Sequence, residues 1–410
     1  MPRLWMAVAA ALLSGLGCGK TSDSESFLTL GVIIPYTGPK AQRGISVERS
    51  LLMSVDQINR SGGVAGHQVK LRVADTRSTT YEGLDAAQDL LGSDEIAAVI
   101  GPEDSALGEL LAPDAKVRDR LLIEPSPTLT SIAIGVGQRT HWVRLNPSIS
   151  ALARRIADEI IADNRKKILV AYVIDSFGTA FNDILVRYVV GGQRSVFSTA
   201  VQLSDASSSA SVVSALDAAR SAPYDAIVVA TYPGQAANLV NETVFQHGPA
   251  RDGQIGWYFP QIARGEDFTN HVLQSYVEGA RGASSGQSAD APAFSDEFEQ
   301  KWFGGTPTED AYYYVDALNL LALGIEGVGL EAGSRLSGSR LLDRIRALTS
   351  LSGRNVHWDQ IGEGLEALRR GEAVTYQGLT GDLSLLEGDP QRSNVTVATW
   401  RIQSGRYVKD

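Results

Sequence analysis

The sequence predicts an α/β protein made of two doubly wound, Rossmann-like lobes, each with a parallel central sheet. Strand-like apolar runs alternate with helical patterns from Phe27 onward, and the alternation starts again near residue 148. The length of 410 residues is enough for two domains. Because repeated strand–helix–strand units form parallel sheets with helices on both faces, we expect one such sheet in each half.

The elements of the first half follow one another closely. We expect strands over 28–35, 69–75, 95–101 and 120–126, and helices over 44–59, 82–91 and 105–119. In the first helix, Val47, Leu51, Val55 and Ile58 recur at helical spacing, and the Ser-Gly-Gly at 61–63 ends it.

The second half repeats the pattern and ends in a mostly helical region. The predicted strands are 167–175, 195–203, 224–233 and 255–261, and the helices are 148–164, one after Phe177-Gly178, 209–220 and 234–248. Beyond these we expect helices at 292–303, 308–326, 338–348 and 358–370, and short strands at 379–386, 395–402 and 406–408.

Composition and motifs disfavour several function classes. The chain is acidic, with a net charge of -10 and no basic tract interleaved with aromatic residues, so we expect no nucleic-acid partner. Its five histidines are scattered and it has one cysteine, so we expect no metal and no cofactor. GASSG at 282–286 matches the G-x-S-x-G of serine hydrolases, but a polar linker follows it instead of a helix, and we do not expect an enzyme.

The N-terminal segment has the pattern of an export signal. An apolar stretch from Leu4 to about Leu16 follows Arg3 and is too short to span a bilayer. We therefore expect a signal peptide over 1–17. Cys18 resembles the modified cysteine of bacterial lipoproteins, although Gly15 stands where their motif usually has Leu; the alternative is an incidental cysteine. Residues 18–26 would then be a lipidated, flexible tether.

Ligands of open parallel sheets bind beyond the carboxyl ends of the strands, and hydroxyl and aromatic side chains gather there in this sequence. Ser105 and Thr128 stand at helix starts, where free backbone N–H groups and the helix dipole favour an anion; both could instead be plain N-caps. Phe177 and Tyr232 follow strands of the second half and could grip a ligand or simply belong to the core.

Residues 28 to 130 resemble the periplasmic leucine/isoleucine/valine-binding proteins, the solute receptors of ABC importers for branched-chain amino acids. The stretches that show this are LTLGVIIPYTG, INRSGGVAGHQVKL, AAVIGPEDS and IEPSPT, and IDSFG, VATYP and YQGLTGDLSL continue it. The resemblance implies the periplasmic binding protein-like I fold, with two lobes joined by three crossovers near Asn146, Gly282 and Gly378. Lobe 1 would be 27–145 plus 283–377, and lobe 2 would be 146–282 plus 378–410.

The resemblance also implies ligand contacts. The carboxylate-binding serine of the family corresponds to Ser105, and the next two contacts, a backbone carbonyl and a threonine hydroxyl, correspond to Ser126 and Thr128. Its two aromatics from the second lobe correspond to Phe177, which replaces a tyrosine, and to Tyr232.

Two positions depart from the family pattern and change the expected ligand. Gln261 stands where the family has the acid that meets the ligand ammonium, and Arg43 stands where it has a tyrosine. A buried ammonium without a counter-ion is costly. Arg43 could hold a second anionic group, or it could be a solvated loop cation, and Asp104 beside Ser105 would oppose an anion unless it points away. We therefore expect a carboxylic acid, an amide or a related small polar metabolite instead of a simple branched-chain amino acid.

The function that follows is a lipid-anchored receptor on the periplasmic side of a bacterial cell envelope. It would be a monomer and would deliver its ligand to separate ABC permease and ATPase chains. The alternative is a sensory receptor of the same fold that signals to a membrane partner.

Overall fold

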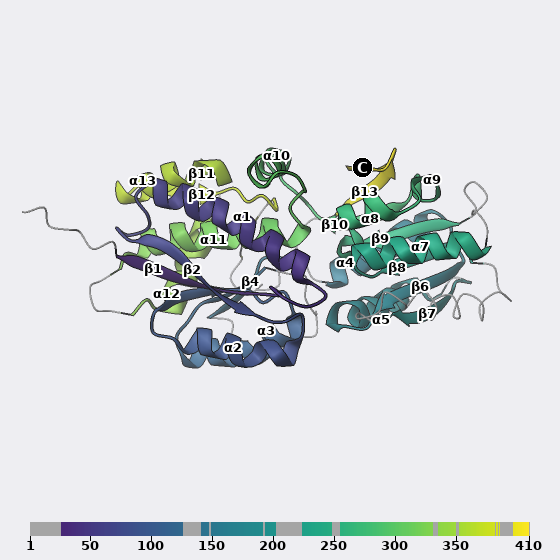
Figure 1. The fold of residues 1–410 in the computed structure, drawn as a ribbon, viewed down its shortest axis with the longest axis horizontal. Coiled ribbons are helices and arrows are strands. Elements are labelled where there is room, and N and C mark those ends of the chain that lie inside the picture. The colour runs from purple at the N-terminus through teal and green to yellow at the C-terminus, as the bar shows by residue number, and fades with distance from the viewer. Residues whose placement is uncertain are drawn as a thin grey trace, which may run out of the picture.

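The polypeptide folds into two lobes that lie side by side, each with a parallel sheet covered by helices (Figure 1). This confirms the predicted fold class. The computed structural model describes residues 26–125, 141–146, 149–191, 193–201, 224–247, 255–330, 335–349, 352–381, 383, 385 and 397–409.

Lobe 1 is built on a five-stranded sheet in the order β2-β1-β3-β4-β5, with every neighbouring pair parallel. Strand β1 is buried from its second residue onward. Its alternate residues enter two different hydrophobic clusters, one with Leu30 and Val32 and the other with Ile33, because successive side chains of a strand point to opposite faces. The strands are β1 (Phe27–Ile34), β2 (Gln68–Asp75), β3 (Ile96–Ile100), β4 (Leu122–Glu124) and β5 (Trp142–Arg144).

Helices cover both faces of this sheet. On one face α1 (Ala41–Arg60) packs against α11 (Glu309–Val328), together with α12 (Gly338–Leu348) and α13 (Ile361–Arg369). On the other face lie α2 (Thr80–Gly92) and α3 (Ser105–Val117) (Figure 1). Helix α11 is buried on all sides from Asp310 to Ile325, which makes it the central helix of the lobe.

Lobe 2 contains a seven-stranded sheet in the order β14-β13-β10-β9-β8-β6-β7. It is parallel from β7 to β10, whereas β13 runs antiparallel to β10 and β14 antiparallel to β13. The strands are β6 (Lys167–Val173), β7 (Ser195–Val201), β8 (Ala226–Ala230), β9 (Gly256–Pro260), β10 (Arg281–Ser285), β13 (Val397–Gln403) and β14 (Arg406–Lys409), and the main helices are α4 (Ile149–Ala162), α5 (Ser176–Val189), α7 (Pro233–His247) and α8 (Glu266–His271).

Several elements differ from the sequence prediction. The strand expected over 379–386 is wrong at its start, where residues 379 and 380 form a turn closed by the bridge between Gly378 and Gly381. Strands β5, β10, β11 (Arg354–Val356) and β12 (Val374–Tyr376) were not predicted. Strand β10 has the sequence RGASS, whose small and polar residues give no apolar pattern. Gly282 has no room for a side chain, because a Cβ there would lie 2.0 Å from the Trp400 ring.

Two further predictions concern a helix and a crossover of lobe 2. The helix expected over 209–220 is outside the described residues. Gly282, near which one crossover was expected, lies inside β10, and this strand stays in the second sheet as far as Ser285. The lobe boundaries given above remain predictions.

Asp316 fixes the segment that follows β12. It lies on α11, is fully buried, and its two carboxylate oxygens accept four hydrogen bonds. Oδ1 accepts from the Tyr376 hydroxyl and the Leu379 N–H, both at 2.8 Å. Oδ2 accepts from the Thr380 N–H at 3.0 Å and from its hydroxyl at 2.7 Å. The central helix of lobe 1 therefore holds the turn at 378–381 in place.

We expect Asp316→Ala to lower the free energy of unfolding by about 3 kcal/mol or more, because it leaves several buried donors without an acceptor. Urea denaturation followed by circular dichroism measures this. Asp343→Ala, which removes an exposed carboxylate from α12, is the matched control and should change stability by less than about 0.5 kcal/mol. Equal effects of the two substitutions would contradict the role given to Asp316.

Candidate functional site

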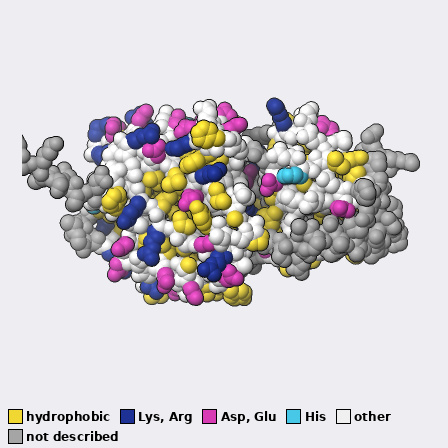
Figure 2. All heavy atoms as spheres, in the orientation of Figure 1, with side chains coloured by type: hydrophobic (Ala, Val, Ile, Leu, Met, Phe, Trp, Pro, Cys, Tyr) yellow, Lys and Arg dark blue, Asp and Glu magenta, His cyan; other side chains and the backbone are white. Residues whose placement is uncertain are grey.

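A cavity of about 770 Å³ lies between the lobes, at the carboxyl ends of the strands. Its size is within the range of small-molecule sites. On the molecular face shown in Figure 2, by contrast, basic and acidic side chains are interspersed and do not gather into one patch. The polar side chains that line the cavity include Lys40, Arg43, Glu103, Asp175, Tyr232, Gln261, Arg264, Thr308, Glu309 and Asp310.

The structure describes only some of the predicted ligand-binding residues. Four of them line the cavity: Arg43, Phe177, Tyr232 and Gln261. Ser126 and Thr128, as well as Cys18 at the expected anchor, lie outside the described residues. Ser105 is buried and is not among the cavity-lining residues, although its neighbours Glu103 and Asp104 are.

The N-cap of α3, which was the alternative considered for Ser105, is Asp104. The Asp104 carboxylate accepts from the Leu107 N–H at 3.0 Å and from the Thr80 hydroxyl at 3.1 Å, and Ser105 is the first residue of α3. Both residue types are good N-caps, but a carboxylate also gains from the helix dipole. The charge of Asp104 is thus turned toward the start of α3.

Tyr232 and Asp175 join the ends of two strands in lobe 2. Tyr232 follows β8, and its hydroxyl donates to Asp175 Oδ2 at 2.7 Å. Asp175 follows β6 and caps α5, since its Oδ1 accepts from the Gly178 N–H at 2.8 Å. Phe177 stacks on Phe181 with ring centroids 5.8 Å apart and is 6% exposed, so it contributes to the core of lobe 2 as well as to the cavity wall.

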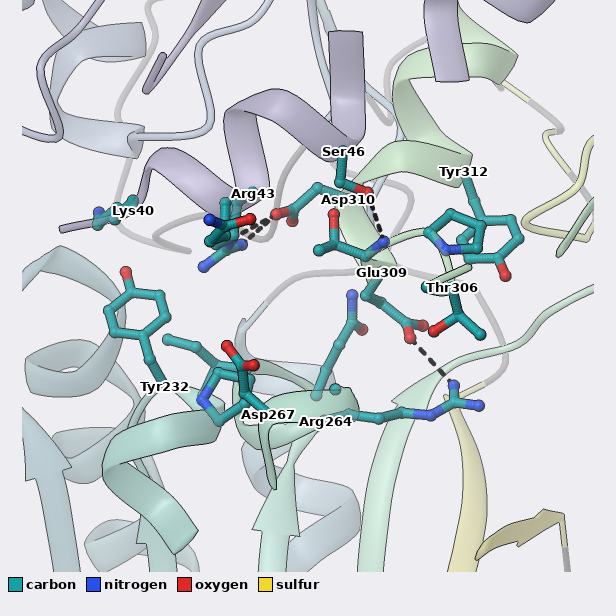
Figure 3. Close-up of a pocket in the computed structure, with 18 of the residues that line it drawn as sticks. Lys40, Arg43, Ser46, Tyr232, Arg264, Asp267, Thr306, Glu309, Asp310 and Tyr312 are labelled. Atoms are coloured by element: carbon teal, nitrogen blue, oxygen red, sulfur yellow. Dashed lines mark hydrogen bonds and ion pairs between the residues drawn. The ribbon is translucent and has the colours of Figure 1, made fainter. Parts of the chain in front are cut away.

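Two cations from the start of α1 cover the Tyr232 ring (Figure 3). The Lys40 ammonium lies 5.3 Å and the Arg43 guanidinium 5.1 Å from the ring centroid. Lys40 is also 4.0 Å from Asp175 Oδ2. Arg43 donates through Nε to Asp310 Oδ2 at 2.6 Å, and its Nη2 is ion-paired with the same oxygen. Tyr232 of lobe 2 therefore contacts lobe 1.

A second contact between the lobes joins Arg264 to Glu309, with Nη1 and Oε2 3.0 Å apart (Figure 3). The Arg264 guanidinium also lies over the Tyr407 ring, 5.2 Å from its centroid. Burial raises the pKa of Glu309, while Arg264 opposes this shift. Glu309 and Asp310 begin α11, where the helix dipole favours acidic residues.

Gln261 offers a donor to the cavity. It is 2% exposed, and its Oε1 accepts from the Ser285 N–H at 2.9 Å and from the Ser285 hydroxyl at 3.0 Å. Its Nε2 is buried and has no hydrogen-bond partner within the described part of the chain. The GASSG motif at 282–286 lies in β10 except for its last glycine, and Ser284 is buried, so the motif does not form the strand-to-helix elbow of a hydrolase.

Glu103 is a carboxyl of the cavity wall that lies near Lys40 and Arg43. Burial raises its pKa to about 7, with Asp104 adding to the shift and Lys40 and Arg43 opposing it. Its Oε1 is 3.4 Å from the Thr76 hydroxyl. Its Oε2 is buried without a partner in the described residues.

Among the residues that the structure describes, no three His, Cys, Asp or Glu side chains are grouped as they would be to hold a metal ion. Within the same residues, no helix has both the length and the apolar character needed to cross a membrane.

Sequence reasoning missed Lys40, Glu309, Asp310 and Arg264. Glu103 and Asp175 were visible as residues that follow strands, but they gave no further signal. Arg43 and Asp310 are 267 positions apart, and Arg264 and Glu309 are 45 apart, so neither pair leaves a local pattern.

A family model described as "Periplasmic binding protein" matches residues 28–365. Among curated relatives, the Leu/Ile/Val-binding protein BraC3 of Rhizobium johnstonii is 31% identical over 121 residues, 30% of this chain and 32% of the relative. The chain thus aligns with about a third of the length of the first curated relatives it matches. The chemotactic signal transduction system substrate-binding protein BasB of Halobacterium salinarum is 24% identical over 366 residues, 87% of this chain and 83% of the relative.

Solved structures share the fold. The branched-chain amino acid transporter substrate-binding protein LivJ of Streptococcus pneumoniae, in complex with isoleucine, has a TM-score of 0.72 at 19% identity and covers 94% of this chain and 100% of its own. A solute-binding protein of an ABC transporter from Rhodopseudomonas palustris BisB5, in complex with 3,4-dihydroxybenzoic acid, has a TM-score of 0.72 at 16% identity, with 94% and 96% covered.

The raised pKa of Glu103 predicts a pH-dependent stability. Between the ordinary value of 4.5 and about 7, the folded protein binds more protons at Glu103 than the unfolded chain does, so its contribution to the free energy of unfolding falls as pH rises. We expect the wild type to lose about 1 to 3 kcal/mol relative to Glu103→Gln across this window.

Urea denaturation of both proteins at pH 4.5, 6 and 7.5 tests this. Glu297→Gln, which removes an exposed carboxylate from α10 (Ala291–Trp302), is the control for loss of a negative charge. A wild-type stability that rises relative to Glu103→Gln over the window would contradict the prediction.

Proposed function

Because the chain belongs to the periplasmic binding protein family, we propose that it is an extracytoplasmic receptor that closes on a small polar ligand and delivers it to an ABC importer. The observation that most supports this is the cavity between the lobes, to which both lobes contribute buried polar side chains. A ligand bound there contacts both lobes at once. Its permease and ATPase partners would be separate chains, and the receptor would act as a monomer.

Ligand capture by this receptor is a hinge motion. The lobes contact each other at two places beside the cavity, where Tyr232 meets Lys40 and Arg43 and where Arg264 meets Glu309. A ligand with partners in both lobes binds the closed form more tightly and shifts the population toward it. A permease that recognises only the closed form would then accept the loaded receptor.

We propose an amino acid, a carboxylic acid or an amide-like compound as the ligand. One of the similar structures is a complex with isoleucine and another is a complex with 3,4-dihydroxybenzoic acid, so the fold accommodates both kinds of compound. The neutral Gln261 disfavours a simple branched-chain amino acid. Arg43 is balanced by Asp310, so it contributes less net positive charge to the cavity than the sequence alone suggests.

A second candidate function is ligand sensing. The relative named as a chemotactic substrate-binding protein aligns over 83% of its own length, far more than BraC3 does. A sensor would pass the closed form to a signalling partner instead of a permease. Purification of the receptor with its membrane partner, followed by an assay of ligand-stimulated ATPase activity, separates the two, because only the importer hydrolyses ATP.

We also propose that the receptor is attached to the membrane through Cys18. Metabolic labelling of the producing bacterium with an alkyne fatty acid should label the wild type. Cys18→Ala should abolish the label and move the protein to the soluble fraction, because a signal peptide without lipid gives no lasting anchor. Ser24→Ala in the same tether is the control and should remain labelled. A labelled Cys18→Ala protein would contradict the anchor.

The binding function predicts coupled stabilisation and closure. In a panel of small carboxylates, amides and amino acids, at least one compound should raise the melting temperature and also reduce the radius of gyration in X-ray scattering. Tyr232→Ala should weaken its binding by about 10-fold or more, because an aromatic side chain that contacts the ligand contributes about 1.4 kcal/mol or more.

Tyr188→Ala, which removes an exposed tyrosine of lobe 2, is the matched control and should bind normally. Stabilisation without compaction, or equal loss in both variants, would count against closure of the lobes around a ligand at Tyr232.

A further inference from the structure

We propose that Lys40 determines the ligand class: its ammonium occupies the place in the cleft that a ligand amino group would take, so the receptor selects acids that lack an amino group. This inference depends on the proposed binding function and specifies its ligand. Three observations support it.

First, Lys40 has the partners that an amine ligand needs. Its side chain is 7% exposed, although lysine is rarely buried. The ammonium lies over the Tyr232 ring and beside Asp175, and an aromatic face with a carboxylate is the usual surrounding of a bound ammonium. Burial lowers the pKa of Lys40, but Tyr232, Glu103 and Asp175 outweigh this and raise it above its ordinary value, so the side chain stays charged.

The backbone of Lys40 is held in place as well. Its N–H donates to the Ser78 hydroxyl at 2.9 Å, and this hydroxyl donates to the Thr37 carbonyl at 2.8 Å. The loop before α2 thus fixes the start of α1. The ammonium is therefore a pre-positioned part of the cleft.

Second, three of the cavity carboxylates, Asp175, Glu309 and Asp310, already have a cation beside them. Asp310 is paired with Arg43, and Glu309 is paired with Arg264. Asp175 accepts from the Gly178 N–H and the Tyr232 hydroxyl, and it has Lys40 beside it. An incoming ammonium would have to displace one of these cations or lie close to it, and like charges in a desolvated site repel strongly.

Third, buried donors remain open at the cavity wall. Gln261 Nε2 and the Thr308 hydroxyl have no partner in the described parts of the chain, and Thr308 makes no side-chain cap on α11. The Lys40 ammonium is 4.0 Å from Asp175, beyond a direct hydrogen bond to it. Glu103 has one unpartnered oxygen and, with its pKa raised to about 7, can also donate a proton below neutral pH. A ligand carboxylate satisfies the donors of Lys40, Gln261 and Thr308, whereas an ammonium does not.

The test compares acids with their 2-amino counterparts on the same carbon skeleton. The pairs are 4-methylpentanoate with leucine, 3-phenylpropanoate with phenylalanine, phenylacetate with phenylglycine, and pentanedioate with glutamate. Titration calorimetry and thermal shift at pH 6.5 give the affinity of each compound for the full-length protein. For every skeleton that binds, we expect the acid to bind about 10-fold or more tightly than its amino acid.

Variants of Lys40 then show whether this residue sets the ligand preference or only supports the fold. Lys40→Met should weaken acid binding by about 10- to 100-fold and shift the acid-to-amino-acid ratio toward the amino acid, because Asp175 loses its cation. Lys40→Arg keeps the charge and should keep the preference for acids. Lys116→Met, which removes an exposed lysine from α3, is the control and should leave the ratio unchanged. If Lys40→Met does not fold, the affinities of the wild type and of Lys40→Arg for the same compounds still test whether the receptor prefers acids.

The possible outcomes distinguish a failure of the role given to Lys40 from a failure of the proposed receptor function. Amino acids that bind the wild type as tightly as their acids, or an unchanged ratio in a folded Lys40→Met, would overturn the role of Lys40 while leaving the receptor function intact. If no compound of either class binds, both the receptor function and this inference are wrong.

Discussion

The first turn of α11 is the constraint on which the cleft depends. Its two acidic residues hold two different cations: Asp310 pairs with Arg43 of its own lobe, and Glu309 pairs with Arg264 of the opposite lobe. Six positions further along the same buried helix, Asp316 fixes the turn at 378–381. One helix in the centre of lobe 1 therefore sets the position of the cleft charges, of a contact between the lobes and of a connecting segment. A shift of this helix would disturb all three together.

The cleft contains many charges for a desolvated site, and their pairing explains how they are tolerated. Removing an ion from water costs several kcal/mol unless a partner and hydrogen bonds compensate. Lys40, Arg43 and Arg264 each lie near a carboxylate and over or beside a tyrosine ring. The protein has thus satisfied most of the charges itself. What it leaves to a ligand is a small set of neutral donors, one pre-positioned ammonium and one carboxyl oxygen of Glu103.

The sequence predicted the fold well because the signal there is local. Apolar periodicity located the strands of both sheets as far as β9, apart from the three-residue strand β5. The rule that ligands bind at strand ends selected Tyr232, and the family resemblance pointed to Gln261. Strand β10 was missed because its burial depends on Trp400, which is more than a hundred positions away. An N-cap at the start of α3 was considered for Ser105, whereas Asp104 provides it, because residue type alone does not distinguish two neighbouring candidates. The paired charges of the cleft arise from contacts between distant segments, and no local pattern encodes them.

The interleaving of the two lobes along the chain also affects the order in which they can form. Lobe 1 needs α11 (Glu309–Val328) packed against the sheet that begins at Phe27, and lobe 2 needs β13 beside β10. During ribosomal synthesis, neither core can be completed until most of the polypeptide has emerged. A translocation channel admits only extended polypeptide, and a topology that completes each core late is compatible with such passage.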